Sequence, residues 1–286
     1  MDYPPLISVL MTAYNREKYI EESIRSVLAS DYENFELIIV DDASTDKTVE
    51  IAKEFAMNDP RVRVIINDKN LGDYANRNNA AQYARGVYIK YLDSDDYIYP
   101  YGLKTMVDMM TAHPNVGWGL CVSKVDFSSD GPLPMELTPK QAYEHHYLGK
   151  SLFNKSPMYA IIKKELFFAE NGFLAERMSS DFEFWHRLAQ KHNLLIMPDG
   201  LIWYRKHPEQ EFSDFPKYMK VYENIRVEYL INENCPLDKQ QIKKAFNLRI
   251  RGLKNQALYF LVKTKFKAAY QNVGLIFFNL FQKWKH

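Results

Sequence analysis

Short apolar runs alternate with helical patterns over the first 125 residues. The near-continuous apolar runs, predicted as buried strands, cover residues 7–11, 35–40, 62–66 and 87–92. The predicted helices, with apolar side chains three or four positions apart, cover about residues 17–30, 45–57 and 74–84. Strands that are apolar on both faces and separated by helices are typical of a mostly parallel sheet covered on both sides. The predicted fold class is α/β.

The rest of the chain divides into a looser stretch and a helical end. Residues 126–160 contain four prolines, and we expect loops and a hairpin there. A helix over residues 181–191 and a short strand over residues 194–197 follow. The pattern is then helical to the C-terminus, which predicts one α/β domain over residues 1–214 and a helical extension over residues 215–286.

The charge of the chain is distributed unevenly along this organisation. The whole sequence of 286 residues has 37 Lys and Arg against 36 Asp and Glu, a formal net charge of +1. Residues 239–286 hold 11 of the basic residues and no acidic one, so the remaining 26 basic and 36 acidic residues give the preceding part a balance of −10. An acidic body with a basic end indicates a separate, anionic partner for that end.

The basic end also carries an apolar stripe. Its side chains, three or four positions apart, are Phe266, Tyr270, Val273, Phe277, Leu280 and Trp284, with Ala269, Ile276 and Phe281 beside them. Basic amphipathic helices with aromatic side chains lie in anionic membrane interfaces. Two alternatives are that the stripe packs on the protein's own α/β domain or pairs in a homodimer. We do not expect nucleic acid as a partner, because the aromatic side chains suit lipid or protein.

Composition and cysteine content favour a globular protein of a reducing compartment. The 47% hydrophobic and 26% charged residues exclude a disordered or collagen-like chain. Cys121 and Cys235 are too few for a disulfide framework and fit buried thiols. No signal-peptide pattern or run of about 18 apolar residues is visible, so we expect a cytoplasmic protein, peripheral at most on the cytosolic face of a membrane.

Unusual polar residues follow three of the predicted strands. They are residues 12–15, the pair Asp41 and Asp42, and the run Asp93, Ser94, Asp95 and Asp96. Ligands of parallel sheets bind at the carboxyl ends of the strands. The sequence has no G-x-G-x-x-G and no G-x-x-x-x-G-K-[ST] phosphate loop, so a nucleotide here would be held by carboxylates and a metal. Carboxylate oxygens suit Mg²⁺ or Mn²⁺.

These segments together resemble glycosyltransferase family two. Residues 8–16, SVLMTAYNR, look like the opening of that family, and residues 40–48, VDDASTDKT, are similar to its V-D-D-G-S-T-D-x-T with Ala43 replacing the usual Gly. Residues 70–72 and 76–78 resemble its N-x-G and A-R-N elements, and residues 92–96 match its L-D-S-D-D. The resemblance implies a GT-A fold, a Rossmann-like sheet with helices on both faces, and inverting sugar transfer from a nucleotide donor.

The resemblance also implies roles at the donor site. Thr12 and Tyr14 would line the nucleotide pocket, and Asp42 would accept the N3–H of uracil or thymine, which favours a UDP- or dTDP-sugar. Asp95 would bind the metal that bridges the donor diphosphate, and Asp93 would contact the ribose or a metal-bound water. Arg77 is either a residue facing the diphosphate or an exposed helix residue.

Two later segments extend the resemblance to the catalytic base and a clamp. Residues 180–188, SDFEFWHRL, resemble the family's E-D-x-D-L-W-L-R-L helix, which makes Asp181 the candidate base and Glu183 the alternative. Residues 204–207, YRKH, look like its Y-R-x-H element. Arg205 would then contact the diphosphate, and His207 would do so or bind the metal.

The sequence leaves other functions and the substrates open. A nucleotidyltransferase also uses an α/β sheet with paired carboxylates, and a non-catalytic nucleotide-sugar-binding module would keep the fold alone. A glycan or lipid-linked acceptor in polysaccharide or glycoconjugate synthesis is expected. Tyr159 and Trp203 lie near the acceptor or in the core.

Overall fold

The computed structural model describes residues 4–122, 131–174, 178–207, 215–262 and 265–285. The described strands of the main sheet are β1 (Ile7–Ala13), β2 (Phe35–Asp41), β3 (Val62–Ile66), β4 (Tyr88–Tyr91), β6 (Trp118–Val122), β7 (Met135–Leu137), β8 (Ala160–Lys163) and β9 (Leu194–Pro198). They are ordered β3-β2-β1-β4-β8-β6-β9-β7. The four predicted strands, now β1 to β4, pair in parallel, and antiparallel pairs with β8 and β7 complete a mixed sheet. β5 (Tyr97–Ile98) and β10 (Ile202–Trp203) form a separate antiparallel pair.

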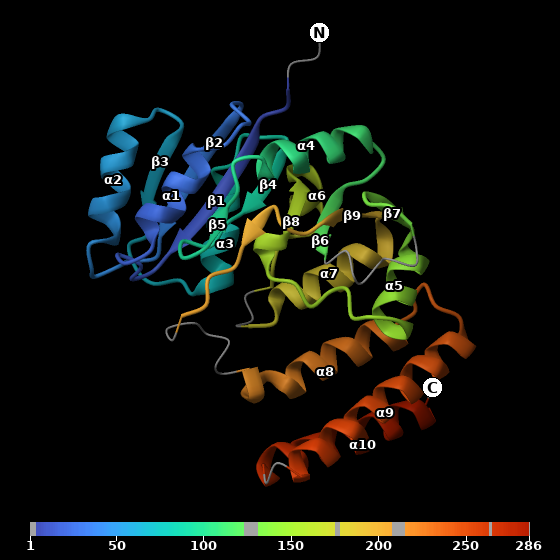
Figure 1. The fold of residues 1–286 in the computed structure, drawn as a ribbon. Coiled ribbons are helices and arrows are strands. Elements are labelled where there is room, and N and C mark those ends of the chain that lie inside the picture. Colours follow the sequence, from blue (N-terminus) through green and yellow to red (C-terminus); the bar gives the residue numbers. More distant parts are fainter. Residues whose placement is uncertain (1–3, 123–130, 175–177, 208–214, 263–264, 286) are drawn as a thin grey trace.

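Helices cover both faces of this sheet (Figure 1). On one face Val9 and Met11 pack with α1 (Ile20–Leu28), α2 (Thr48–Asn58) and α4 (Gly102–Ala112). On the other face Leu10 packs with α3 (Asp73–Gln82), α6 (Lys164–Ala169) and α7 (Ser180–Lys191). Successive side chains of a strand point to opposite faces, so β1 is apolar on both. The predicted α/β class is confirmed.

The prediction of loops and a hairpin over residues 126–160 was wrong in part. Residues 139–148 form the helix α5 (Pro139–Leu148), and residues 157–159 form a 3₁₀ turn before β8. Thr138 and Gln141 form a capping box in which each side chain bonds the other's backbone N–H, and Pro139 occupies the first helical position. Proline is tolerated there because that N–H has no helical partner. It therefore starts a helix here instead of breaking one.

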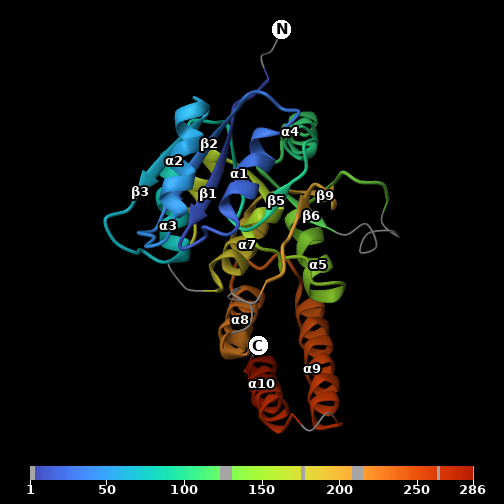
Figure 2. The same ribbon diagram turned by 60° about the vertical axis from the view of Figure 1, so that its left-hand side comes forward.

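Three helices form the C-terminal part: α8 (Phe215–Ile231), α9 (Lys239–Val262) and α10 (Phe266–Lys285). α8 packs against α7, the N-terminal part of α9 packs against α5, and α10 packs along α9. The C-terminal end of α9 and the start of α10 lie farthest from the sheet (Figure 2). The predicted boundary at residue 214 lies outside the described residues. Among the helices described, none has the length and apolar content needed to cross a membrane.

Candidate active site

The carboxyl ends of β1, β2 and β4 meet at one edge of the sheet. The turns that follow them contain two residues with left-handed backbones, Asn15 with φ 51° and Ala43 with φ 64°. Asn15 accepts a hydrogen bond from the backbone N–H of Thr45 at 2.9 Å, and the N–H of Asn15 donates to the Ser44 hydroxyl at 2.9 Å. The β1 and β2 turns are thereby fastened to each other, which fixes the polar edge of the sheet.

An open cavity of about 2110 Å³ extends from this edge towards the C-terminal helices. It is lined by eight of the nine predicted site residues: Thr12, Tyr14, Asp42, Arg77, Asp93, Asp95, Asp181 and His207. The structure thus brings together side chains from the first and last parts of the α/β fold. Arg205 is not among the described residues that line the cavity, whereas its neighbour Lys206 is.

Asp42 is buried and its carboxylate is held by the loop after β3. Its Oδ1 accepts hydrogen bonds from the Asn67 side chain and the Leu71 N–H, each at 2.8 Å, and its Oδ2 accepts one from the Gly72 N–H at 2.9 Å. Gly72 has φ 87°, a conformation in which glycine is not strained. Since a carboxylate oxygen has two lone pairs, Oδ2 keeps capacity for one further donor.

Arg77 is buried, so its interpretation as an exposed helix residue was wrong. Its Nε donates to Asp73 Oδ1 at 2.9 Å, and one terminal nitrogen lies 2.7 Å from Asp93 Oδ1. The Tyr91 hydroxyl donates to the Arg77 carbonyl at 3.0 Å. Arg77 therefore fixes the orientation of the Asp93 carboxylate at the cavity wall.

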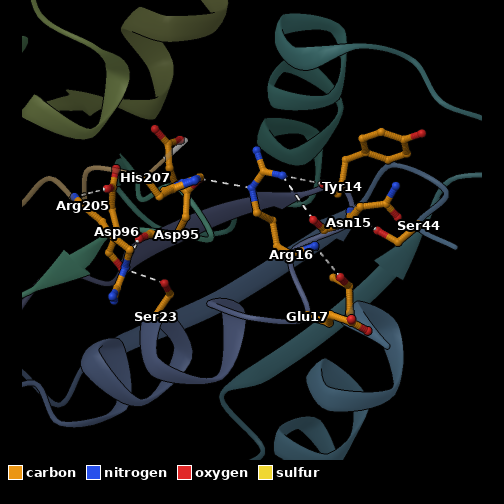
Figure 3. Close-up of polar contacts among 12 residues, drawn as sticks. Tyr14, Asn15, Arg16, Glu17, Ser23, Ser44, Asp95, Asp96, Arg205 and His207 are labelled. Atoms are coloured by element: carbon orange, nitrogen blue, oxygen red, sulfur yellow. Dashed lines mark hydrogen bonds and ion pairs between the residues drawn. The ribbon is translucent and has the colours of Figure 1, made fainter. Parts of the chain in front are cut away.

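Asp95 contacts an arginine and a histidine from distant segments (Figure 3). Its Oδ2 lies 3.1 Å from Arg16 Nε and 3.0 Å from His207 Nε2. Arg16 also donates to the carbonyls of Tyr14 and Asn15 at 3.1 and 3.2 Å. The sequence predicted no role for Arg16. The available signal was its place at the end of the motif over residues 8–16, directly after Asn15.

Arg205 holds the Asp95–Asp96 turn from outside the cavity. Its backbone N–H donates to Asp96 Oδ1 at 2.9 Å, its Nε donates to the Asp95 carbonyl at 2.8 Å, and its terminal nitrogen contacts Glu22 at 2.6 Å. Its guanidinium also lies 4.9 Å from the centre of the exposed Trp203 ring. These contacts hold the Arg205 side chain against the acidic turn.

Asp96 is the most deeply buried carboxyl group of the acidic turn. Burial, with the charges of Asp93 and Asp95 adding to it, raises the pKa of Asp96 to about 8. The described residues include no group of three His, Cys, Asp or Glu side chains placed to hold a metal ion. Asp95 and His207 still form a pair of oxygen and nitrogen donors facing the cavity. Such a pair fits a divalent cation whose other ligands come from phosphate and water.

Asp181 lies in the first turn of α7 and lines the same cavity. Burial raises its pKa to about 7, although hydrogen bonds from the Phe182 N–H, at 2.7 Å, and from Tyr74 lower it. The alternative base Glu183 is buried in an ion pair with Arg187 at 2.8 Å and is not among the described lining residues. Of these two carboxylates, Asp181 is the one that the structure places in the cavity.

Further lining residues come from segments for which the sequence predicted no donor site, although Tyr159 was expected near the acceptor or in the core. Phe153 and Tyr159 precede β8, Tyr222 belongs to α8, and Tyr259 and Lys265 lie at the end of the α9–α10 hairpin. The cavity is thus much larger than a nucleotide site alone, and its far end is aromatic and basic. A parallel sheet edge with carboxylates around an open cavity is the arrangement of α/β enzymes that bind nucleotides.

Comparison with known proteins gives the particular family. The family model of Glycosyl transferase family 2 matches residues 8–168, more than half of the chain. The chain belongs to this family and is a glycosyltransferase. Two relatives span most of its length: an uncharacterized glycosyltransferase of Methanocaldococcus jannaschii, 33% identical over 76% of this chain and 77% of its own, and glycosyltransferase GlyG of Streptococcus pneumoniae, 33% identical over 70% and 71%.

Solved structures share the GT-A fold at lower identity. TarS of S. aureus, residues 1–349 in complex with UDP, superposes with a TM-score of 0.61 at 23% identity, over 84% of this chain and 69% of that chain. A mannosyltransferase from Pyrobaculum calidifontis in complex with GDP-Man and Mn²⁺ gives 0.62 at 18% identity, over 97% and 88%. The predicted GT-A fold is confirmed by these matches.

Proposed function

We propose that this glycosyltransferase moves a sugar from a nucleotide diphosphate to a hydroxyl group of a glycan or lipid-linked acceptor, in one displacement that inverts the anomeric carbon. The observation that carries the proposal is that Asp42, Asp93, Asp95 and Asp181 line the same cavity. A binding module that had lost activity would not need a further carboxylate, Asp181, in the cavity. The product would belong to a polysaccharide or glycoconjugate, and the two free cysteines, Cys121 and Cys235, support a cytoplasmic reaction.

The donor is proposed to be a UDP- or dTDP-sugar. Thr12 and Tyr14 line the cavity next to Asp42, whose Oδ2 can accept the N3–H of uracil or thymine. The complex of TarS with UDP supports this proposal, because that protein shares the fold. The mannosyltransferase complex contains a guanine nucleotide instead, so the base remains the part of the donor to test first.

A divalent cation, Mn²⁺ or Mg²⁺, is the proposed cofactor, held by Asp95 and His207. When bound, it would neutralise charge on the leaving diphosphate. Arg77 would keep Asp93 oriented towards the ribose or a cation-bound water. Arg205 is proposed as a positioning residue for the acidic turn, and Lys206, which lines the cavity, as the cation beside the diphosphate.

Asp181 is the proposed general base. A base with a pKa of about 7 is about half ionised at neutral pH and able to hold the proton of an acceptor hydroxyl. Its place in the lining of the cavity would let an acceptor hydroxyl approach it beside the donor. Tyr74, which donates to Asp181, would keep the carboxylate in that orientation.

The proposal is tested by following hydrolysis of UDP- and dTDP-sugars with and without Mn²⁺. We expect cation-dependent release of UDP or dTDP, abolished by Asp95→Ala. Asp108→Ala, an exposed carboxylate of α4 outside the cavity, is the matched control and should keep wild-type release. Release of pyrophosphate from a nucleoside triphosphate and a sugar phosphate would instead identify a nucleotidyltransferase. Binding of the nucleotide sugar without turnover, with or without acceptor glycans, would identify a binding module.

A further inference from the structure

The α9–α10 hairpin exposes large apolar side chains on its outer side and at its far end. We define the hairpin surface by the most exposed of them, Leu258, Val262, Tyr270, Phe277, Phe281 and Trp284. Trp284 is 86% exposed, Tyr270 80% and Phe277 68%. The interpretation that this stripe packs on the protein's own α/β domain was therefore wrong. Exposed apolar patches of this kind mark interaction sites.

The inward side of α10 contains the apolar Ala269 and Leu275 beside two asparagines, whereas Tyr270, Phe277 and Trp284 are exposed. Asn272 and Asn279 are buried, and Asn279 Nδ2 donates to Glu223 Oε1 of α8 at 2.8 Å. Asn279 also donates to the Leu275 carbonyl at 2.9 Å. The contact with Glu223 fixes the rotation of α10 about its own axis. With this rotation the large aromatic side chains of the stripe stay exposed, so a buried contact sets the outward direction of the stripe.

The charge around the hairpin surface is of one sign. Residues 239–286 contain 11 basic residues and no acidic ones. Arg251, Lys254 and Lys265 are exposed in the described part of this hairpin. Two copies of the chain paired through this surface would bring two such basic faces together, which disfavours association. A surface of negative charge with an apolar interior suits both features at once.

We propose that the hairpin surface docks on a lipid bilayer that carries anionic headgroups. The aromatic side chains would enter the boundary between headgroups and acyl chains, and the Lys and Arg side chains would contact the lipid phosphates. Tyr and Trp suit this boundary because each has an apolar ring and a polar atom.

The docked orientation has a consequence for the reaction. Tyr259, Lys265 and Gln271 of the same hairpin line the outer end of the cavity. The cavity would therefore open beside the bilayer, where an acceptor attached to a lipid presents its hydroxyl group. This assignment of a lipid-linked acceptor rests on the proposed function, whereas docking itself does not.

The test uses the full chain and vesicles of phosphatidylglycerol mixed with phosphatidylcholine, or of phosphatidylcholine alone. We expect co-sedimentation with the anionic vesicles, weakening as salt is added. Replacing Phe277→Ser and Trp284→Ser together should weaken binding by about tenfold or more. The matched control replaces Met57→Ser and Val87→Ser, which are exposed apolar residues of the α/β part, and should bind as the wild type.

The possible outcomes distinguish docking on lipid from dimer formation, and they test docking separately from the proposed reaction. Equal binding to both vesicles, or binding to neither, overturns docking. A dimer of the wild type in sedimentation velocity would also overturn docking if the Phe277 and Trp284 replacements dissociated it and the wild type did not bind vesicles. UDP-sugar hydrolysis by the double variant should equal that of the wild type. Vesicle binding by a chain that hydrolyses no nucleotide sugar would support docking and refute the proposed function.

Discussion

At the scale of single residues, three neighbouring carboxylates have three different environments. Asp93 is paired with Arg77, Asp95 with Arg16 and His207, and Asp96 accepts from a backbone N–H while burial raises its pKa. The side chains that face the cavity, Asp93 and Asp95, are the ones held by cations. Asp96 instead fixes the turn. Residues of the same type in one motif therefore have different roles: two face the cavity and one holds the backbone.

Asp181→Asn tests the base. An amide cannot take the acceptor proton, so we expect kcat to fall by a factor of about 100 to 10,000 while donor affinity is kept. With the pKa at about 7, the wild-type rate should fall as pH decreases below 7, because the carboxylate becomes protonated. The measurement is a pH–rate profile of sugar transfer with donor affinity measured in parallel.

Asp181→Asn also has a predicted effect on stability, which distinguishes a catalytic role of Asp181 from a structural one. The pKa of Asp181 is raised on folding, so the folded protein loses stability as pH rises from about 4 through 7, because the unfolded state ionises there while the buried carboxyl keeps its proton. Asparagine avoids that loss, and the variant should melt at a higher temperature than the wild type at pH 8. An inactive variant that also melts lower would indicate a structural role for Asp181.

At the scale of elements, the turn between β2 and α2 carries backbone strain, and the sequence alone indicates where. Ala43 stands where the family has Gly, and its φ is 64°. The left-handed conformation costs a non-glycine residue about 1–2 kcal/mol, and glycine returns about 0.4–1 kcal/mol of that through its flexible unfolded state. Ala43→Gly should therefore raise the free energy of unfolding by about 0.5–1 kcal/mol, measured by urea denaturation.

The control for this turn is a second Ala→Gly change at an ordinary conformation. Ala56 lies within α2, where glycine should lower the free energy of unfolding by about 1 kcal/mol. If Ala43→Gly lowered the free energy of unfolding as Ala56→Gly does, the prediction of backbone strain at Ala43 would be wrong.

The elements also show what the sequence could and could not predict. Strands β1 to β4 and helix α7 have strong periodic patterns, and their predicted positions agree with the structure within a few residues. α5 was missed because Pro139 and the prolines around the helix were interpreted as breakers, although Thr138, Pro139 and Gln141 form a helix start. The stripe on α10 was visible, but its direction was not, since that depends on the contact of Asn279 with Glu223.

The candidate site divides in the same way. Motifs at the strand ends located Asp42, Asp93 and Asp95, because parallel topology brings those ends together. The contacts of Arg16 with Asp95, and of Arg205 with Glu22, join residues 79 and 183 positions apart. Such contacts depend on how loops fold over the sheet edge, and no local pattern encodes them.

At the scale of the whole molecule, one buried carboxylate connects the C-terminal helices to one another. Glu223 of α8 accepts from Arg249 Nε of α9 at 2.9 Å and from Asn279 Nδ2 of α10 at 2.8 Å. Arg226, one turn after Glu223, contacts His146 of α5 at 3.1 Å. The rotation of α10, and hence the direction of the hairpin surface, depends on this cluster.

Glu223→Gln should loosen the C-terminal helices as a unit. The substitution removes the charge that compensates Arg249, and breaking a buried ion pair costs about 3–5 kcal/mol. We expect a lower melting temperature by circular dichroism and faster proteolysis within residues 239–286. Glu228→Gln, an exposed position on the same helix, should change stability by no more than about 0.5 kcal/mol. If the two variants melt together, the helices are held by apolar packing, and the direction of the hairpin surface does not depend on Glu223.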